Sequence, residues 1–180
     1  MSKYFQLLFS IFRFIYAKYI VRATLSCHFI QVHSLLSSLA LYKRSRLTLG
    51  RNVQLSAFSE LFVAPDAQLS IGEGTYLNKR CIISVQKKIS IGKNCLFGPD
   101  VKVYDNNHVF EKGHGVIQGK HKIKPVKIGD NCWIASNVVI LPGTHIGNNC
   151  VVAANTVVKG EIPDNSIVSM TGKMIVKEIS

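Results

Sequence analysis

The residues best suited to chemistry stand together in the segment VYDNNHVF, residues 103–110. It places an acid, Asp105, two amides and His108 between apolar residues. A free imidazole has a pKa of about 6.5, so a histidine can take up and release a proton near neutral pH. His108 is therefore a candidate general base, and the alternative is a solvated histidine on a turn. Asp105, Glu111 or a backbone carbonyl could orient its second ring nitrogen, and the sequence leaves that choice open.

A repeat of six residues defines the element that must position this histidine. An aliphatic residue returns at every sixth place, and a residue that is mostly small stands two places before it, at the fifth place of the hexad. The aliphatic residues are Ile128, Ile134, Ile140, Ile146, Val152 and Val158, and the fifth-place residues are Cys132, Val138, Thr144, Cys150, Thr156 and Ile162. Residues two apart on a strand point to the same side, whereas a helix would scatter a period of six around its axis. The pattern predicts short strands around one interior.

Pairs of an aliphatic residue and glycine mark a larger unit. They are Leu49-Gly50, Ile71-Gly72, Ile91-Gly92, Ile128-Gly129 and Ile146-Gly147, separated by 22, 20, 37 and 18 residues. Eighteen residues are three hexads, which predicts a triangular coil of three strands. The interval of 37 holds one coil and 19 extra residues, which predicts a protruding loop over residues 104–127, immediately around His108. His114 and His121 fall in this loop and are expected to line a site or to face solvent.

The cysteines fit the same repeat. Cys81, Cys95, Cys132 and Cys150 all occupy the fifth place of a hexad, so they are expected to be buried structural thiols, and only Cys27 lies outside this explanation. Five cysteines and no signal-peptide cleavage pattern favour a cytoplasmic location over a disulfide-bonded secreted protein.

Residues 1–46 differ from the rest in composition. Eight of the 22 basic residues precede Glu60, the first acidic residue, and they are interleaved with Phe, Leu and Ile. We expect one or two helices here that lie on the anionic inner face of the cytoplasmic membrane, and the alternative is packing on the protein's own body. Nucleic acid is the rival anionic partner, but the apolar content favours lipid. The polar residues that interrupt the segment argue against a transmembrane span.

Between about Leu47 and Pro163 the sequence resembles the hexapeptide-repeat sugar O-acetyltransferases, a family that includes galactoside, maltose, and capsule or exopolysaccharide O-acetyltransferases. The resemblance is densest in IGDNCWIASNVVILPGTHIGNNCVVAANTVVKGEIP, residues 128–163. It implies an all-β fold, a left-handed parallel β-helix, over residues 47–168, followed by a tail at 169–180. It also implies acetyl-coenzyme A as co-substrate without a metal, a sugar or glycan acceptor, and a homotrimer whose sites lie between subunits.

The resemblance assigns roles to individual residues. His108 matches the general base that removes the proton of the acceptor hydroxyl, and Asn78 matches the acceptor-binding asparagine. Trp133 and Ser136 match positions beside the pantetheine arm, and Ala154 matches a backbone contact to it. The family has a Thr-Lys pair at this point, and this sequence has Lys159-Gly160 instead. Lys159 is therefore a candidate coenzyme contact that departs from the family pattern. Two further departures are Gln86, where a second acceptor-binding acid is expected, and Lys173, a candidate phosphate partner in an atypical C-terminal segment.

Three other functions compete with this interpretation. A β-helix carbonic anhydrase needs a zinc-binding His-x4-His pair, and the intervals of six and seven among His108, His114 and His121 do not fit it. A serine acetyltransferase would carry a larger helical N-terminal domain than forty residues allow. A non-catalytic, membrane-docked scaffold of a polysaccharide assembly complex stays open.

Overall fold

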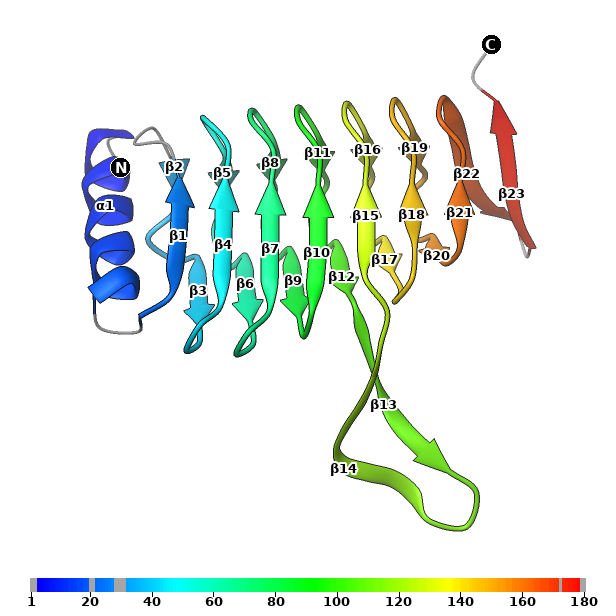
Figure 1. Ribbon diagram of the computed structural model, residues 1–180. Coiled ribbons are helices and arrows are strands. Elements are labelled where there is room, and N and C mark those ends of the chain that lie inside the picture. Colours follow the sequence, from blue (N-terminus) through cyan, green and yellow to red (C-terminus); the bar gives the residue numbers. More distant parts are fainter. Residues whose placement is uncertain (1–2, 20–21, 28–31, 172, 179–180) are drawn as a thin grey trace.

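The computed structural model describes residues 3–19, 22–27, 32–171 and 173–178. One helix, α1 (Lys3–Tyr19), precedes a parallel β-helix with three flat faces (Figure 1). In Figure 1 the front strands rise, the chain returns downward behind them, and each coil lies to the right of the previous one. This winding is left-handed, the exception to the usual crossover rule that the family resemblance implies.

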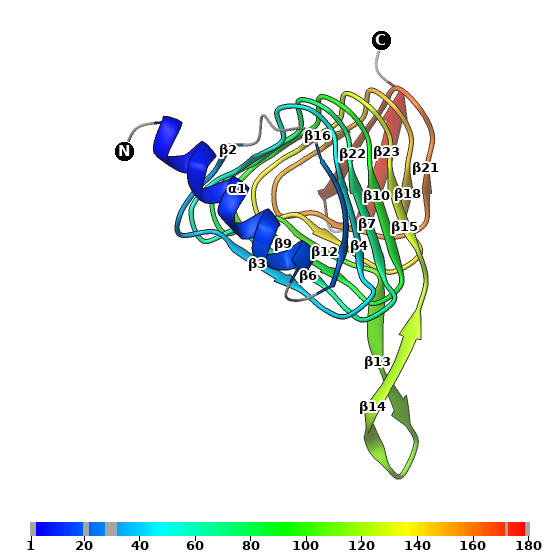
Figure 2. The same ribbon diagram turned by 60° about the vertical axis from the view of Figure 1, so that its left-hand side comes forward.

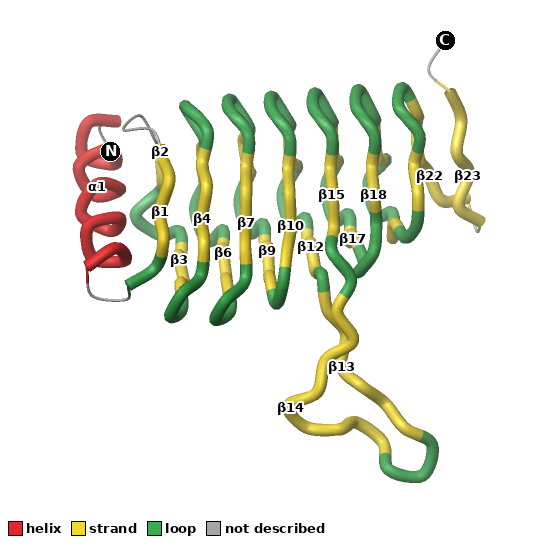
Figure 3. The backbone as a smooth tube through the Cα atoms, in the orientation of Figure 1, coloured by secondary structure: helices red, strands yellow, loops and turns green. Residues whose placement is uncertain are grey.

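Each face is one sheet whose neighbouring strands belong to successive coils. Sheet A contains β1 (Thr24–Cys27), β4 (Arg46–Leu49), β7 (Gln68–Ile71), β10 (Lys88–Ile91), β15 (Val126–Ile128), β18 (His145–Ile146) and β21 (Glu161–Ile162). Sheet B contains β2 (Val32–His33), β5 (Gln54–Leu55), β8 (Tyr76–Leu77), β11 (Leu96–Phe97), β16 (Trp133–Ile134), β19 (Val151–Val152), β22 (Ser166–Thr171) and β23 (Lys173–Glu178). Sheet C contains β3 (Ser38–Leu41), β6 (Glu60–Val63), β9 (Ile82–Val85), β12 (Lys102–Tyr104), β17 (Val139–Ile140) and β20 (Val157–Val158). Loops join the sheets at the three edges of the prism (Figure 3).

The interior confirms the six-residue repeat. All six aliphatic residues of the hexads and all six fifth-place residues are buried. The strand register also confirms the coil lengths, because Arg46 pairs with Gln68, Ile89 with Val126, and Lys127 with His145. The interior is therefore filled by side chains, and a site has to lie on the outside of the prism.

The close stacking of coils at the edge between sheets A and B accounts for the repeated glycines and for two of the buried thiols. A Cβ on Gly92 would lie 2.5 Å from the backbone carbon of Gly129, so the coils could not stack with a larger residue there. Beside these glycines, the thiols of Cys95 and Cys132 donate to the carbonyls of Gly129 and Gly147, each at 3.1 Å. The four thiols assigned to the hexads are buried and unbridged, as predicted, and burial raises the pKa of the Cys81 thiol to about 11. The side chain of Cys27 lies outside the described residues.

The β-helix begins earlier than the sequence analysis places it. Strands β1, β2 and β3 already belong to it, and β1 pairs in parallel with β4 over Thr24 to Cys27. The boundary at residue 46 is therefore replaced by one near residue 24. The hexad pattern is weak there because polar residues occupy inward positions, among them the buried His33 and Ser45. Burial, followed by the charge of Arg13, lowers the pKa of His33 to about 3.

Helix α1 covers this first coil and lies across the end of the prism (Figure 2). Ser10 and Ala17 are buried, and the Arg13 guanidinium donates to the carbonyl and hydroxyl oxygens of Ser37 at 3.0 and 3.1 Å. Phe14 meets the His33 ring edge-on, with centroids 5.5 Å apart. The helix packs on the protein's own body, the alternative that the sequence left open. No helix in the described parts of the chain is long and apolar enough to cross a membrane.

Two hairpins interrupt the regular winding. The predicted loop is a two-stranded antiparallel hairpin of β13 (Asn106–Glu111) and β14 (Gly115–Ile123), which projects from the edge between sheets C and A (Figure 1). At the C-terminal end, β22 and β23 form a second antiparallel hairpin. The expected tail at 169–180 is thus partly strand, because β22 continues sheet B through Thr171.

Candidate active site

His108 lies where the rigid prism gives way to the hairpin. It stands on β13, directly opposite His121 on β14, and the register of the two strands shifts between His108 and Val109. The two imidazole rings are 4.9 Å apart and inclined by 41°. His108 is exposed, whereas the Nδ1 atom of His121 is buried without a hydrogen-bond partner among the described residues. His108 therefore faces solvent, and the ring of His121 packs against it.

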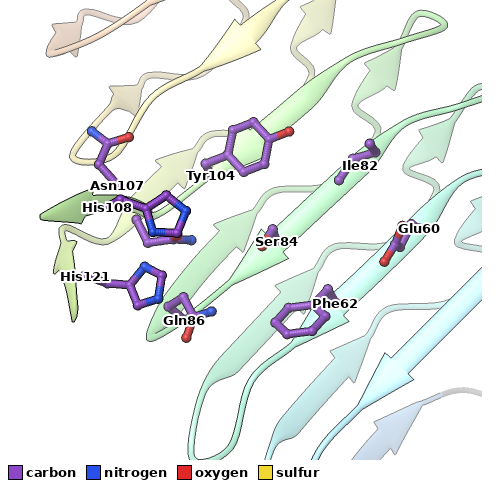
Figure 4. Close-up of a pocket in the computed structure, with 10 residues that line it drawn as sticks. Glu60, Phe62, Ile82, Ser84, Gln86, Tyr104, Asn107, His108 and His121 are labelled. Carbon is purple, nitrogen blue, oxygen red and sulfur yellow. The ribbon is translucent and has the colours of Figure 1, made fainter. Parts of the chain in front are cut away.

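A cavity of about 540 Å³ opens in front of this pair on the outer face of sheet C. Figure 4 shows the rings of His108 and His121 beside each other, with Gln86 next to them. The lining residues are Glu60, Phe62, Ile82, Ser84, Gln86, Tyr104, Asn106, Asn107, His108 and His121. A carboxylate, amides and hydroxyls beside two aromatic rings can bind a molecule that carries both hydroxyl groups and an apolar face, as a sugar does.

Tyr104 keeps its proton in this cavity. Burial, followed by the negative charge of Glu60, raises the pKa of the Tyr104 hydroxyl above its ordinary value. A neutral phenol can both donate and accept a hydrogen bond, so Tyr104 and Glu60 offer complementary groups to one ligand.

Asp105 has a different role from the one considered for it. Its carboxylate is fully buried and accepts hydrogen bonds from the backbone N–H groups of Gln86, Lys87 and Lys88 at 2.7–2.8 Å. The Asn106 side chain donates a fourth bond at 3.2 Å. No hydrogen bond joins Asp105 to His108 within the described part of the chain. Asp105 is therefore a positioning residue: it fastens the root of the hairpin to the preceding coil and does not orient the His108 ring.

Replacing Asp105 by Ala should lower the free energy of unfolding by about 2–4 kcal/mol, since it leaves several partly buried N–H groups without an acceptor. Urea denaturation measures the loss. Asp130→Ala is the matched control, because that carboxylate accepts from a single backbone N–H, that of Lys93, at an exposed position. The Asp130→Ala control should lose much less free energy of unfolding. Unchanged stability in Asp105→Ala, together with a shifted pH–rate profile, would restore the orienting role.

The other predicted site residues lie on two different edges of the prism. Lys159 follows β20 on the edge between sheets C and A, the same edge that carries the hairpin and His108. Asn78, Ser136 and Ala154 follow β8, β16 and β19 on the edge between sheets B and C.

The second group forms a continuous surface. The Asn155 amide donates to the Ser136 carbonyl at 3.0 Å, so the turns that carry Ser136 and Ala154 stack directly. Trp133 stands beside them on sheet B and is half exposed, at 51%. Sheet C separates this surface from His108 within one chain. One chain alone therefore does not bring all the predicted site residues together.

Sequence reasoning missed several residues of the cavity, namely Glu60, Phe62, Ser84 and Tyr104. The repeat contained the signal, because Phe62 pairs with Ser84 and Ser84 with Tyr104 across successive coils. Counting back from Tyr104 by 20 and then 22 residues identifies the outward positions beside His108. The residues described in the structure contain no group of three or more His, Cys, Asp or Glu side chains placed to hold a metal ion.

Comparison with known proteins places the chain in a family. Residues 125–160 match the model of the bacterial transferase hexapeptide (six repeats), and residues 88–101 match the hexapeptide repeat of succinyl-transferase. Galactoside O-acetyltransferase of Escherichia coli K12 is 30% identical over 142 residues, which cover 78% of this chain and 68% of that protein. The chain belongs to the hexapeptide-repeat acetyltransferases.

Other relatives agree with this membership. The putative lipopolysaccharide biosynthesis O-acetyl transferase WbbJ of Escherichia coli K12 is 31% identical over 73% of this chain and 68% of its own length. A putative acetyltransferase of Saccharomyces cerevisiae, YJL218W, is 34% identical over 63% of this chain, and the match spans only 58% of that protein.

Solved structures show the same fold. A maltose O-acetyltransferase from Clostridium difficile 630 has a TM-score of 0.55 and 35% identity over 62% of this chain and 59% of its own. A hexapeptide-repeat acetyltransferase from Vibrio cholerae, solved with acetyl coenzyme A, has a TM-score of 0.61 and 22% identity over 95% of this chain and 78% of its own. At that identity the second likeness concerns the fold alone.

Proposed function

We propose that this hexapeptide-repeat acetyltransferase moves an acetyl group from acetyl-coenzyme A to a hydroxyl of a sugar or of a surface-polysaccharide precursor. The observation that carries the proposal is the place of His108, which is exposed at the junction of prism and hairpin beside a cavity lined by polar and aromatic side chains. The relatives named for galactoside and lipopolysaccharide acetylation support a carbohydrate acceptor.

His108 acts as the general base in this proposal. Its imidazole accepts the proton of the acceptor hydroxyl while the oxygen attacks the thioester carbonyl. The new C–O bond gives a tetrahedral intermediate, which collapses as the C–S bond breaks. The imidazolium then returns the proton to the departing coenzyme A thiolate, so the histidine ends as it began. The acetyl group passes directly to the acceptor without an acyl-enzyme.

The residues around His108 position the reactants. His121 contacts the catalytic ring from the second strand of the hairpin and restricts its orientation. Both Glu60 and Gln86 line the cavity, where the carboxylate can accept and the amide can accept or donate hydrogen bonds with hydroxyls. Phe62 offers a face for the apolar side of a sugar ring. Gln86 stands where the family resemblance implies a second acceptor-binding acid, which favours a different acceptor from galactosides.

We further propose that the site is completed by a second chain in a homotrimer. Sheet C separates His108 from Asn78, Trp133, Ser136 and Ala154 in one chain. If both edges contribute to one reaction, the hairpin edge of one prism has to face the edge between sheets B and C of its neighbour. The coenzyme then lies in the groove between two prisms, along the small residues Ser136 and Ala154, and Lys159 is available to a phosphate.

The direct test incubates the full-length protein with radiolabelled acetyl-coenzyme A and a panel of free, nucleotide-linked and lipid-linked sugars. We expect labelled acetyl esters on a carbohydrate acceptor, with one thiol of coenzyme A released for each ester. Free serine is included in the panel, and its acetylation in place of sugars would show an amino-acid acceptor. A protein that binds no acetyl-coenzyme A and transfers no label would favour the scaffold function.

A further inference from the structure

Helix α1 presents its apolar side to solvent. The residues at positions 8, 12, 15, 16 and 19 follow one face of a helix, and each is at least half exposed. They are Leu8 (65%), Phe12 (69%), Ile15 (51%), Tyr16 (54%) and Tyr19 (68%), and we call them the outer stripe. The opposite face, with Ser10, Arg13 and Ala17, lies against the first coil. A helix stabilised only by packing on the prism would normally turn its apolar face inward, so this arrangement indicates a second surface that covers the outer stripe.

The apolar surface continues beyond the helix. A groove of about 390 Å³ runs between α1 and β3, and its lining includes Phe12, Tyr16, Leu39 and Tyr42. The Tyr42 ring contacts that of Phe62 just beyond it, with centroids 5.1 Å apart and planes inclined by 53°. Helix and groove together give the N-terminal end of the prism a broad apolar face.

Positive charge surrounds this apolar face. Among the side chains described between α1 and the start of β4, the exposed cations are Lys18, Arg22, Lys43, Arg44 and Arg46. No acidic residue precedes Glu60 in the chain. Arg44 is paired with Asp66 of the next coil, whereas the salt bridges found in the described residues do not include the other four. The end of the prism therefore combines an apolar stripe with a cationic rim that Asp66 neutralises only in part.

We propose that this end of the protein docks on an anionic phospholipid bilayer, with α1 lying in the plane of the interface and the outer stripe among the upper acyl chains. Tyrosine and phenylalanine side chains suit the boundary between headgroups and hydrocarbon, and lysine and arginine suit anionic headgroups. A second copy docked end to end would bring two cationic rims together, so charge complementarity favours lipid over self-association. In Figures 1 and 2 the helix lies across the end of the prism and the coils stack away from it, so the prism would stand upright on the membrane.

The proposed trimer would strengthen binding to the membrane. Three prisms packed side by side in the same direction would place three outer stripes at one end. Binding through three stripes raises the overall affinity far above that of one helix, because the second and third contacts become intramolecular. The cavity beside His108 would then face along the membrane surface, at a height set by the coils between α1 and the hairpin.

The test is co-sedimentation of the full-length protein with vesicles of phosphatidylcholine alone or of phosphatidylcholine with phosphatidylglycerol, at low and high salt. We expect at least tenfold stronger partitioning onto the anionic vesicles, and weaker binding as salt screens the rim. The double variant Phe12→Ser/Tyr16→Ser should lose at least tenfold in partitioning. Phe58→Ser is the matched control, since Phe58 is also exposed, at 61%, but lies on a turn between β5 and β6.

Equal binding of the wild type and the double variant would overturn the proposal, and so would the absence of any preference for anionic vesicles. A doubling of the oligomer mass without vesicles, reversed by Phe12→Ser/Tyr16→Ser, would identify a second copy as the occupant instead. Acetyl transfer to a soluble acceptor without vesicles is measured in parallel. It should be unchanged in the double variant, so a failure of docking is distinguishable from a failure of the proposed activity.

Discussion

His108→Ala is expected to lower kcat/KM for acetyl transfer by about 10²- to 10⁴-fold, the range that a positioned general base contributes. A sugar hydroxyl is a weak nucleophile at neutral pH, and in the proposed mechanism the exposed imidazole at the root of the hairpin takes its proton. The loss should fall mainly on kcat, because binding of acetyl-coenzyme A relies on other residues. Initial rates of coenzyme A release over a range of acceptor concentrations measure kcat/KM, and the rate at saturation gives kcat.

His145→Ala is the matched control for this variant. His145 is also an exposed histidine at the end of a coil, but it lies on sheet A and pairs with Glu161 at 2.9 Å. It should retain transfer within about twofold of the wild type, as expected for a surface substitution. Retention of activity in His108→Ala, at unchanged oligomer size, would remove His108 from the mechanism and leave His121 as the histidine to test next.

The sequence was sufficient for most of the fold because each coil repeats the same local constraints. The hexads place Ile134, Ile140 and Ile146 inside, and the close stacking at Gly92 excludes a larger residue. The fifth-place cysteines follow from the same register. The one large departure from the count of eighteen, the interval of 37 residues, was enough to predict a protruding loop at His108, since an insertion into a solenoid can only project outward.

The first coil escaped prediction because its inward positions do not follow the repeat. His33 is buried against Phe14 under α1, a packing that no hexad pattern indicates. The orientation of α1 was also unexpected. Its polar stripe, with Ser10 and Arg13, faces the protein, because Arg13 finds hydrogen-bond acceptors on Ser37.

The candidate site was predictable in part. The sequence located His108 and a protruding loop beside it. Asp105 near a histidine looked like an orienting acid, but its carboxylate accepts hydrogen bonds from three backbone N–H groups of the preceding coil. Such bonds depend on how coils stack, and a residue interval does not encode them. The aromatic and acidic side of the cavity became visible only when Phe62, Ser84 and Tyr104 were seen to pair across coils.

A mixture of two inactive variants tests the proposed site between chains. His108→Ala removes the base on the hairpin edge, and Ala154→Arg fills the proposed coenzyme groove on the edge between sheets B and C. Ala154 is exposed in the single chain, so the larger side chain should not disturb the fold. Each variant alone should show little transfer. In a randomly mixed trimer, a site is intact when one chain supplies His108 and its neighbour supplies Ala154, which holds for about one quarter of the sites.

The decisive measurement is therefore the rate of acetyl transfer after the two variants are co-expressed in equal amounts and purified as mixed oligomers. We expect recovery of about one quarter of the wild-type rate, and no recovery when His108→Ala is mixed with a chain that carries both substitutions. A rate no higher than the sum of the two separate variants, in oligomers shown to contain both chains, would contradict a His108 site completed by a neighbouring chain.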